Sequence, residues 1–593
     1  MLVDDGVLQP LDGRWTLAGD LSDITIPPTI HALLAARLDR LEPEERAVIE
    51  RASVVGRLFW WGAVAELSPA ELRPRVIVHL QSLARKELIR PDYSEPSQEA
   101  SFRFAHILMR DAAYNGISKG ERAELHERLA DWIEIEARDL AGEYEEILGY
   151  HVEQATRLLL DLGPASERTA ALGKRAARML AAAGQRAFAQ GDMPAAVNLL
   201  ARAVSLVAED GRERAELLPQ LAFALFETGE YGRLRDVVAE ATETASASGD
   251  ADLEAYALIL GLFVRLAWEP EGWAEAAQPE ARRAIAAFET IGDERGLGKA
   301  WALLGLVYIE KAQFAEAEQA WEKAAAHSRS AGDRREQLES LSWVPLAVWA
   351  GPTPVGEGLL RCAEVLKHAE GDKKVLGSAL AAQAAFEAGL GNFDAARELI
   401  RRAKAALQEI ALSVWLAGPV AQFAGWVELL AGDAKAADRE LRWGYDTLTR
   451  LGELSWLSTL AAILAESVYE QGHHDEAEQL ILACEASAGA EDAYSHALLR
   501  SVRAKLLAQR GQTDEAERLA SEAVALADTT DFLHLRWHTR LSQGEVLQRV
   551  GRADAVRQVA EAAAAIADRK GSRVGAERAA EQLRLLEQRS AVP

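Results

Sequence analysis

A lysine beside a glycine would be the first residue pair to consider for chemistry on a nucleotide. A phosphate-binding loop has the pattern GxxxxGK[ST], in which backbone N–H groups and the lysine surround the phosphates and a hydroxyl binds magnesium. The two nearest pairs are Gly173-Lys174 and Gly298-Lys299. Neither has the upstream glycine or a serine or threonine after the lysine, and no strand is expected before either. The sequence therefore predicts no nucleotide-binding loop.

Other reactive side chains are spaced equally poorly for catalysis. Glu44-Glu45 lies at an expected helix start, where acidic residues favour the helix rather than serve as a general acid and base. His473-His474 point to different sides of a turn and have no cysteine nearby. Cys362 and Cys484 are too far apart in sequence to form a disulfide framework or a zinc motif. We expect no catalytic residue, no metal site and no cofactor, and thus no enzyme.

Composition narrows the class of partner. The chain has 66 Lys and Arg against 92 Asp and Glu, a net charge of −26. Nucleic-acid binders need a basic face, because phosphate neutralisation supplies much of their affinity. Residues 28–132 hold 15 basic and 16 acidic residues, so no local basic patch offsets the acidic total. The two cysteines and an N-terminus without a signal peptide favour a reduced, cytoplasmic compartment.

Ten turn positions recur along the chain at a nearly constant spacing. Each is a small turn residue, often glycine, followed by a polar residue and in the clearest copies by an alanine five places on, as in Gly432-Asp433 and Ala437. Clear copies begin at 191, 391, 432, 472 and 511, weaker ones at 229, 271, 312, 351 and 551, and successive differences lie between 38 and 42. A period of about 40 residues indicates a structural repeat.

Each repeat reads as two helices. The glycine would end the first helix in the left-handed conformation, and the small alanine would let the second helix approach closely. In 472–487 the apolar residues Ala477, Leu480, Ile481 and Cys484 share one helical face. A single pair cannot bury its apolar stripe, whereas stacked pairs can. The fold class is therefore all-α, an α-solenoid of about ten helical pairs over 171–590.

The pattern resembles the tetratricopeptide repeat. The resemblance lies in AFALFETG at 222–229 and in the A-x-x-x-[large]-x-x-A stretches AVNLLARA at 196–203 and AEQAWEKA at 317–324. The family period is 34, so the extra residues would lengthen either the helices or the loop between units. The resemblance implies a superhelix whose concave face binds a protein or peptide.

Residues 28–118 show a different pattern. Helices are expected over 43–55, near 62–67 and near 71–85, and 88–104 has the alternation of a β-hairpin with a polar loop at 91–100. Three helices and a hairpin make a winged-helix-like module with that loop as its wing. Residues 119–170 would form a helical connector to the solenoid.

This region is similar to a junction in bacterial STAND-type ATPase regulators, which are often fused to class III adenylate or guanylate cyclases. The similarity rests on 26–64, on LARKELI at 83–89, and on 102–134. It implies a nucleotide-switched regulator with a nucleotide-binding domain in the same chain or in a partner. It makes 1–27 the remnant of an NTPase-domain tail, with Met1 an internal methionine of a longer ancestor or of a longer gene. His106 and Arg110, in HILMRD, match a family motif and become candidates for nucleotide sensing. The phosphate loop and the paired cyclase aspartates are missing here.

Tryptophans are the candidates for partner binding. Trp343, Trp349, Trp415 and Trp426 lie in the repeats, where core packing is the default but aromatic hot spots on a concave face are the alternative. The apolar stretch 412–431 contains Gln422, Glu428 and Gly418-Pro419, which favours a buried repeat helix over a membrane span.

Three functions are therefore compatible with the sequence. The first is a non-catalytic scaffold or sensor that binds a protein or peptide. The second is the regulatory part of a nucleotide-switched ATPase or cyclase regulator. The third, a transcription regulator that reads DNA through the winged helix, is disfavoured by the charge of 28–132.

Overall fold

The computed structural model describes residues 8–11, 14–17, 34, 37–92, 100–136, 141–208, 212–368, 371–410 and 412–590. The chain divides into two compact units, Met1–Ala183 with Ser205–Val207, and Gly184–Val204 with Ala208–Pro593. Most of the expected NTPase tail at 1–27 lies outside the described residues. What is described there is a hairpin of β1 (Leu8–Leu11) and β2 (Arg14–Leu17), with Leu8 opposite Leu17.

The first unit contains a small helical module with a three-stranded sheet. Its helices are α2 (Pro43–Val55), α3 (Trp61–Leu67) and α4 (Val76–Arg85). The expected hairpin is present as β4 (Ile89–Asp92) and β5 (Ser101–Phe104), and β3 (Leu58–Trp60) adds a third antiparallel strand beside β5. The sequence showed β3 only as an aromatic run. The helix expected from 71 begins later, because Pro74 lies in a short 3-10 turn, η2 (Arg73–Arg75).

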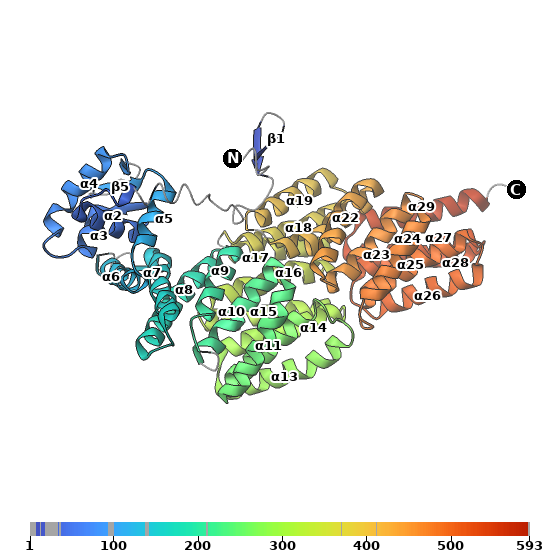
Figure 1. Ribbon diagram of the computed structural model, residues 1–593. Helices are drawn as coiled ribbons and strands as arrows, with labels where there is room; N and C mark the ends of the chain where they lie inside the picture. Colours follow the sequence, from blue (N-terminus) through green and yellow to red (C-terminus); the bar gives the residue numbers. More distant parts are fainter. Residues whose placement is uncertain are drawn as a thin grey trace. The chain divides into compact units, whose positions relative to one another are not determined.

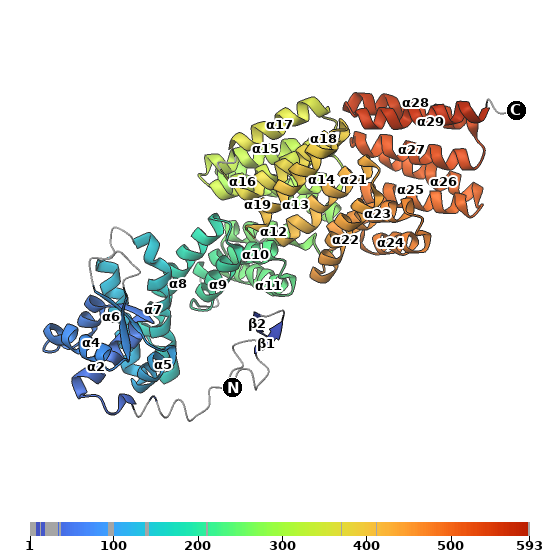
Figure 2. The ribbon, with the colours of Figure 1, turned by 90° about the horizontal axis from the view of Figure 1, so that it is seen from above.

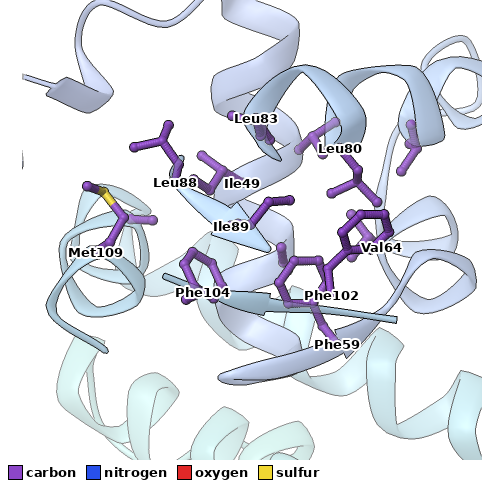
Figure 3. Packing of buried hydrophobic residues seen from close by; sticks show 14 of the residues in the cluster. Ile49, Phe59, Val64, Leu80, Leu83, Leu88, Ile89, Phe102, Phe104 and Met109 are labelled. Carbon is purple, nitrogen blue, oxygen red and sulfur yellow. The ribbon is translucent and has the colours of Figure 1, made fainter. Parts of the chain in front are cut away.

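One apolar core holds this module together, as Figure 3 shows. Ile49 of α2, Phe59 of β3, Leu80 of α4 and Ile89 of β4 are fully buried, and Phe104 of β5 is 1% exposed. The assignment to the winged-helix class stays a prediction, and the expected wing falls mostly on 93–99, outside the described residues.

Longer helices follow in the first unit: α5 (Ile107–Gly116), α6 (Lys119–Glu136), α7 (Ala141–Leu162) and the first part of α8 (Glu167–Ala189). Two buried histidines join α6 to α7, since His126 Nδ1 lies 2.9 Å from His151 Nδ1. Burial lowers the pKa of His126 to about 2 and that of His151 to about 4. Both rings are therefore neutral at physiological pH.

The second unit is an α-solenoid of tetratricopeptide-like helical pairs, which stack side by side in Figures 1 and 2. All ten predicted turns separate the two helices of a pair. The pairs are α8/α9 (α9 Met193–Val204), α10/α11 (Arg212–Thr228, Tyr231–Ser248), α12/α13 (Ala251–Arg265, Trp273–Ile291), α14/α15 (Glu294–Glu310, Phe314–Ser330), α16/α17 (Arg334–Ala350, Val355–His368), α18/α19 (Lys373–Gly389, Phe393–Gln408), α20–η4–α21/α22 (Ser413–Trp415, Leu416–Val420, Ala421–Ala431, Ala434–Leu451), α23/α24 (Ser455–Glu470, His474–Ser487), α25/α26 (Ala493–Gln509, Thr513–Asp528) and α27/α28 (Leu533–Arg549, Ala553–Lys570), followed by α29 (Arg573–Ser590).

Helix length sets the 40-residue period. In the α14/α15 pair each helix has 17 residues, with three residues between the helices and three more before α16, so that 17 + 3 + 17 + 3 gives 40. The residues beyond the usual 34 of a tetratricopeptide repeat therefore lie in the helices and not in long loops.

Most of the turn glycines behave as expected, with two corrections. Gly391 and Gly432 have φ of +81° and +78°, in the left-handed region. Gly351 does not, because its φ is −78°. A Cβ at Gly351 would instead lie 2.9 Å from the Ala347 carbonyl oxygen, so close packing is what requires glycine there. The turn position that the sequence predicted at Glu271 lies one residue later, since Gly272 has the positive φ of +63°.

The alanines five residues after the turns are buried, and this leads to a test. Ala437 of α22 and Ala477 of α24 are fully buried. Replacing either by leucine should cost about 1–3 kcal/mol, because the larger side chain overpacks the helix pair. Ala486 of α24 is exposed, so Ala486→Leu is the matched control and should leave the urea midpoint unchanged. Equal midpoints for the three variants would contradict this packing.

The solenoid also contacts itself between pairs that are far apart in the chain. The carboxylate of Glu491 accepts hydrogen bonds from the backbone N–H groups of Ala274 and Glu275 at the start of α13. Asp531 accepts from the N–H groups of Phe314 and Ala315 at the start of α15, at 2.9 and 2.7 Å. These partners are 216 or 217 residues apart. Carboxylates at helix N-termini satisfy otherwise unpaired N–H groups and favour the helix dipole.

A buried lysine makes the equivalent contact at a helix C-terminus. Lys570 Nζ donates to the carbonyl oxygens of Trp349 and Gly351, each at 2.7 Å, and these residues lie 221 and 219 positions away. Such contacts hold pairs α12–α17 against the turns that precede α25, α27 and α29.

The apolar segment 412–431 lies within this packing. Ser413–Ala431 is long and apolar enough to cross a membrane by composition, and 89% of its most apolar window is buried in the protein. Pro419 lies in the π-helical turn η4, where a missing backbone N–H is tolerated.

Candidate ligand-binding cavity

The first helices of the pairs enclose a cavity in the second unit. Its volume is about 830 Å³, part of which is open to solvent. Four phenylalanines form part of the wall: Phe226, Phe263, Phe314 and Phe532.

Three tryptophans complete the aromatic wall. Trp343 of α16 stacks on Trp456 of α23, with ring centroids 6.4 Å apart, and Trp349 meets the edge of Phe532 at 5.0 Å. Trp343 also stacks on Trp321 of α15 at 5.4 Å. These contacts fix the ring planes, because aromatic pairs prefer offset or edge-to-face geometries.

Two of the four tryptophans proposed for partner binding therefore line the cavity, namely Trp343 and Trp349. Trp415 lies behind the wall with its edge against Trp343 at 5.0 Å. Trp426 donates to the Tyr494 hydroxyl at 2.8 Å. The four side chains are only 1–5% exposed, so none of them offers its ring on an open surface.

Acidic groups of the cavity were missed in the sequence. Glu310 of α14, Glu453 before α23 and Asp492 before α25 line it. Burial raises the pKa of Glu310 to about 8, and the nearby carboxylates of Asp492, Glu453 and Glu491 add to the rise. Burial also raises the pKa of Glu453 to about 8, against the effect of backbone N–H groups at the start of α23.

These acids have no cationic partner. No lysine, arginine or histidine is among the described residues that line the cavity, and none there forms an ion pair with Glu310, Glu453 or Asp492. Elsewhere in the unit, buried carboxylates are paired, as in Glu466 with Lys505 at 2.5 Å. A signal for Glu310 was present, since it continues the apolar stripe of Leu303, Leu306 and Val307 at the i+7 position.

An amide also lines the cavity. Gln422 of α21 is 3% exposed, and its Nε2 donates to the Tyr494 hydroxyl at 3.2 Å. No donor in the described part of the chain reaches its Oε1. A buried carbonyl oxygen without a donor costs free energy, which a ligand that donates to it would recover.

His106 and Arg110 lie in the other unit. His106 is exposed at the start of α5. The Arg110 guanidinium donates to the Ser53 carbonyl oxygen at 2.9 Å, pairs with Asp111 at 3.1 Å and covers the Tyr114 ring. Arg110 thus joins α5 to α2. In the described part of the chain, no three His, Cys, Asp or Glu side chains are grouped as a metal site would need.

The solved structures that resemble this chain do so at low sequence identity, and no family model and no curated protein matches the sequence. A STAND protein with a tetratricopeptide repeat sensor from Pyrococcus horikoshii is 14% identical, with a TM-score of 0.44. That match covers 78% of this chain and 66% of the other, so the chain spans just under two thirds of its length. Rap protein complexed with competence and sporulation factor is 13% identical over 62% of this chain and 99% of its own, with a TM-score of 0.45. Yeast Tom70 is 13% identical over 80% and 100%, with a TM-score of 0.29.

Proposed function

We propose that the chain is a non-catalytic scaffold or sensor whose repeat unit binds a peptide or protein segment in the cavity lined by Trp343, Trp349 and Trp456. The observation that carries the proposal is the cavity itself. Its aromatic wall and its few polar groups, among them Gln422 and Glu310, are typical of a ligand-binding site.

The resemblance of the N-terminal module to STAND-type regulators supports a second, finer role. In that role the repeat unit is the sensor of a nucleotide-switched ATPase or cyclase regulator, and the nucleotide-binding domain is supplied in the same chain or by a partner. A cytoplasmic location fits both roles. DNA binding is the weaker alternative, because 28–132 is close to neutral.

Filling the cavity tests the proposal. Ala267 and Ala350 line it and are 3% and 2% exposed. Once a ligand has been isolated on the immobilised chain and identified, Ala267→Phe and Ala350→Leu should each weaken its binding at least about tenfold, an effect of ~1.4 kcal/mol, because the added side chain occupies ligand space. Ala486→Phe, on the exposed side of α24, is the matched control and should bind like the wild type.

Isothermal titration calorimetry measures the affinities, and thermal melting shows which variants fold. Unchanged affinity in both folded cavity variants would place the ligand elsewhere on the protein and contradict the proposal.

A further inference from the structure

The charge inside the cavity is one-sided. Glu310, Glu453 and Asp492 line it and no basic side chain of the described residues does. A buried carboxylate without a partner is costly, so proteins normally pair it or keep it protonated. Glu453 is 3% exposed, and Glu310 and Asp492 are partly buried, so three acids without a cationic partner in one aromatic cavity indicate that the cavity lacks positive charge.

Two of the three acids have structural tasks. Asp492 Oδ1 accepts from the Ser495 N–H at 2.9 Å and caps α25. Glu453 Oε2 accepts from the Trp456 N–H at 2.9 Å at the start of α23. These hydrogen bonds explain why an acidic residue occupies each helix start. They do not supply a positive charge to balance either carboxylate.

Glu310 has no such task. It is the last residue of α14, where a negative charge opposes the helix dipole. Its carboxylate accepts from the Ser455 hydroxyl at 3.2 Å, and its neighbours Asp492, Glu453 and Glu491 are all acidic. The helix dipole, burial and the acidic neighbours all disfavour the ionised form of Glu310, and groups with such perturbed ionisation are concentrated at binding sites.

The remaining wall fits a cation on an apolar stem. Tryptophan and phenylalanine faces attract ammonium and guanidinium groups and also pack against methylene chains. The Gln422 Oε1, which has no donor among the described residues, can accept from an N–H of such a group. An anionic ligand would face three acidic side chains and no basic side chain of the described residues, so the cavity disfavours it.

We propose that the cavity recognises the positively charged side chain, lysine or arginine, of a peptide whose neighbouring residues are apolar. This inference rests on the proposed function, a peptide ligand in the same cavity, and adds the chemistry that the ligand must carry.

Matched peptides test the charge. Ac-Leu-Lys-Phe-NH2 and its norleucine analogue differ only in the ammonium group, and phenethylammonium is the small cation without a peptide. Titration of the full chain should show the lysine peptide binding at least about tenfold more tightly than the norleucine peptide. In Glu310→Gln this preference should fall to about twofold or less, whereas Glu289→Gln, an exposed acid of α13, should keep the wild-type preference.

The outcomes separate the two proposals. Equal binding of the lysine and norleucine peptides would overturn the charge preference and leave the peptide site intact. Binding of phenethylammonium alone, lost in Glu310→Gln, would support the cation site and contradict a peptide ligand. No binding of any probe up to millimolar concentration would overturn both.

The pH dependence of binding distinguishes a charge interaction with these acids from apolar packing alone. A cation in the cavity favours the ionised forms of Glu310 and Glu453, because their pKa values are raised to about 8 in the free protein. Affinity for the lysine peptide should therefore rise about tenfold or more between about pH 6 and pH 8.5, with the norleucine peptide nearly constant. The binding enthalpy at neutral pH should also differ between buffers of different ionisation enthalpy. A lysine-peptide affinity independent of pH would contradict contact with these acids.

Discussion

Replacing Lys374 by methionine should lower the free energy of unfolding by about 3–5 kcal/mol, the largest single effect we expect. Lys374 Nζ lies 2.7 Å from Glu227 Oε1 and 2.6 Å from Glu339 Oε2, and the two glutamate side chains are 2% and 7% exposed. The methionine would fill much of the same space but leave two buried carboxylates close together without the ammonium group that pairs with both of them. The cost arises from those stranded charges, not from lost packing.

The adjacent residue provides the control. Lys373 is paired with Glu409 at 2.8 Å, but the side chains are 41% and 60% exposed. Exposed pairs contribute at most about 1 kcal/mol, so Lys373→Met should change the urea midpoint little. The triple variant Lys374→Met, Glu227→Met, Glu339→Met should recover much of the loss, because it removes the stranded acids as well. Tryptophan fluorescence measures the urea midpoint of each variant. Equal midpoints for Lys374→Met and Lys373→Met would show that the buried ion pairs of Lys374 do not stabilise the fold.

The second large effect is a contribution of Glu310 to stability that is lost as pH rises between about 4.5 and 8. Glu310 has a pKa of about 8 in the folded chain and about 4.5 when unfolded. The folded state therefore holds a proton in this range that the unfolded state has released, so the stabilisation is complete below 4.5 and is lost as pH rises through 8. The slope approaches ~1.4 kcal/mol per pH unit for each such carboxyl, which amounts to a few kcal/mol between pH 5 and pH 8.

A glutamine at 310 isolates this contribution. Glu310→Gln cannot release the proton, so its stability relative to the wild type should improve steadily from pH 5 to pH 8. The buried histidines His126, His151, His534 and His538, whose pKa values are also lowered by burial, are present in both proteins and cancel in the difference. Thermal melts at each pH measure the difference, with exposed Glu289→Gln as the control. A constant difference between Glu310→Gln and the wild type would show that Glu310 is already ionised in the fold.

Local signals explain how much of this fold could be predicted. Gly432 ends one helix and Ala437 packs in the next, and both facts follow from neighbours within a few residues. Contacts such as Asp531 with the N–H of Phe314 could not be found in this way, because 217 residues separate the partners and no local pattern links them.

The cavity was predictable only in part for the same reason. The sequence singled out Trp343 and Trp349 by residue type but could not show that they share one wall with Phe532 and Trp456. Glu310 was visible as an acid in an apolar stripe, yet its meaning depends on Glu453 and Asp492, which belong to other pairs.

The helix-capping carboxylates of Glu491 and Asp531 also determine when the starts of α13 and α15 can be capped during synthesis. The starts of α13 and α15 are made long before the carboxylates of Glu491 and Asp531 that satisfy them. At typical ribosomal rates, about 217 residues take roughly 10–40 s to emerge. During that interval the backbone N–H groups at the starts of α13 and α15 lack their carboxylate partners, and the aromatic wall of the cavity lacks Phe532. The last repeats therefore complete the cavity only at the end of synthesis.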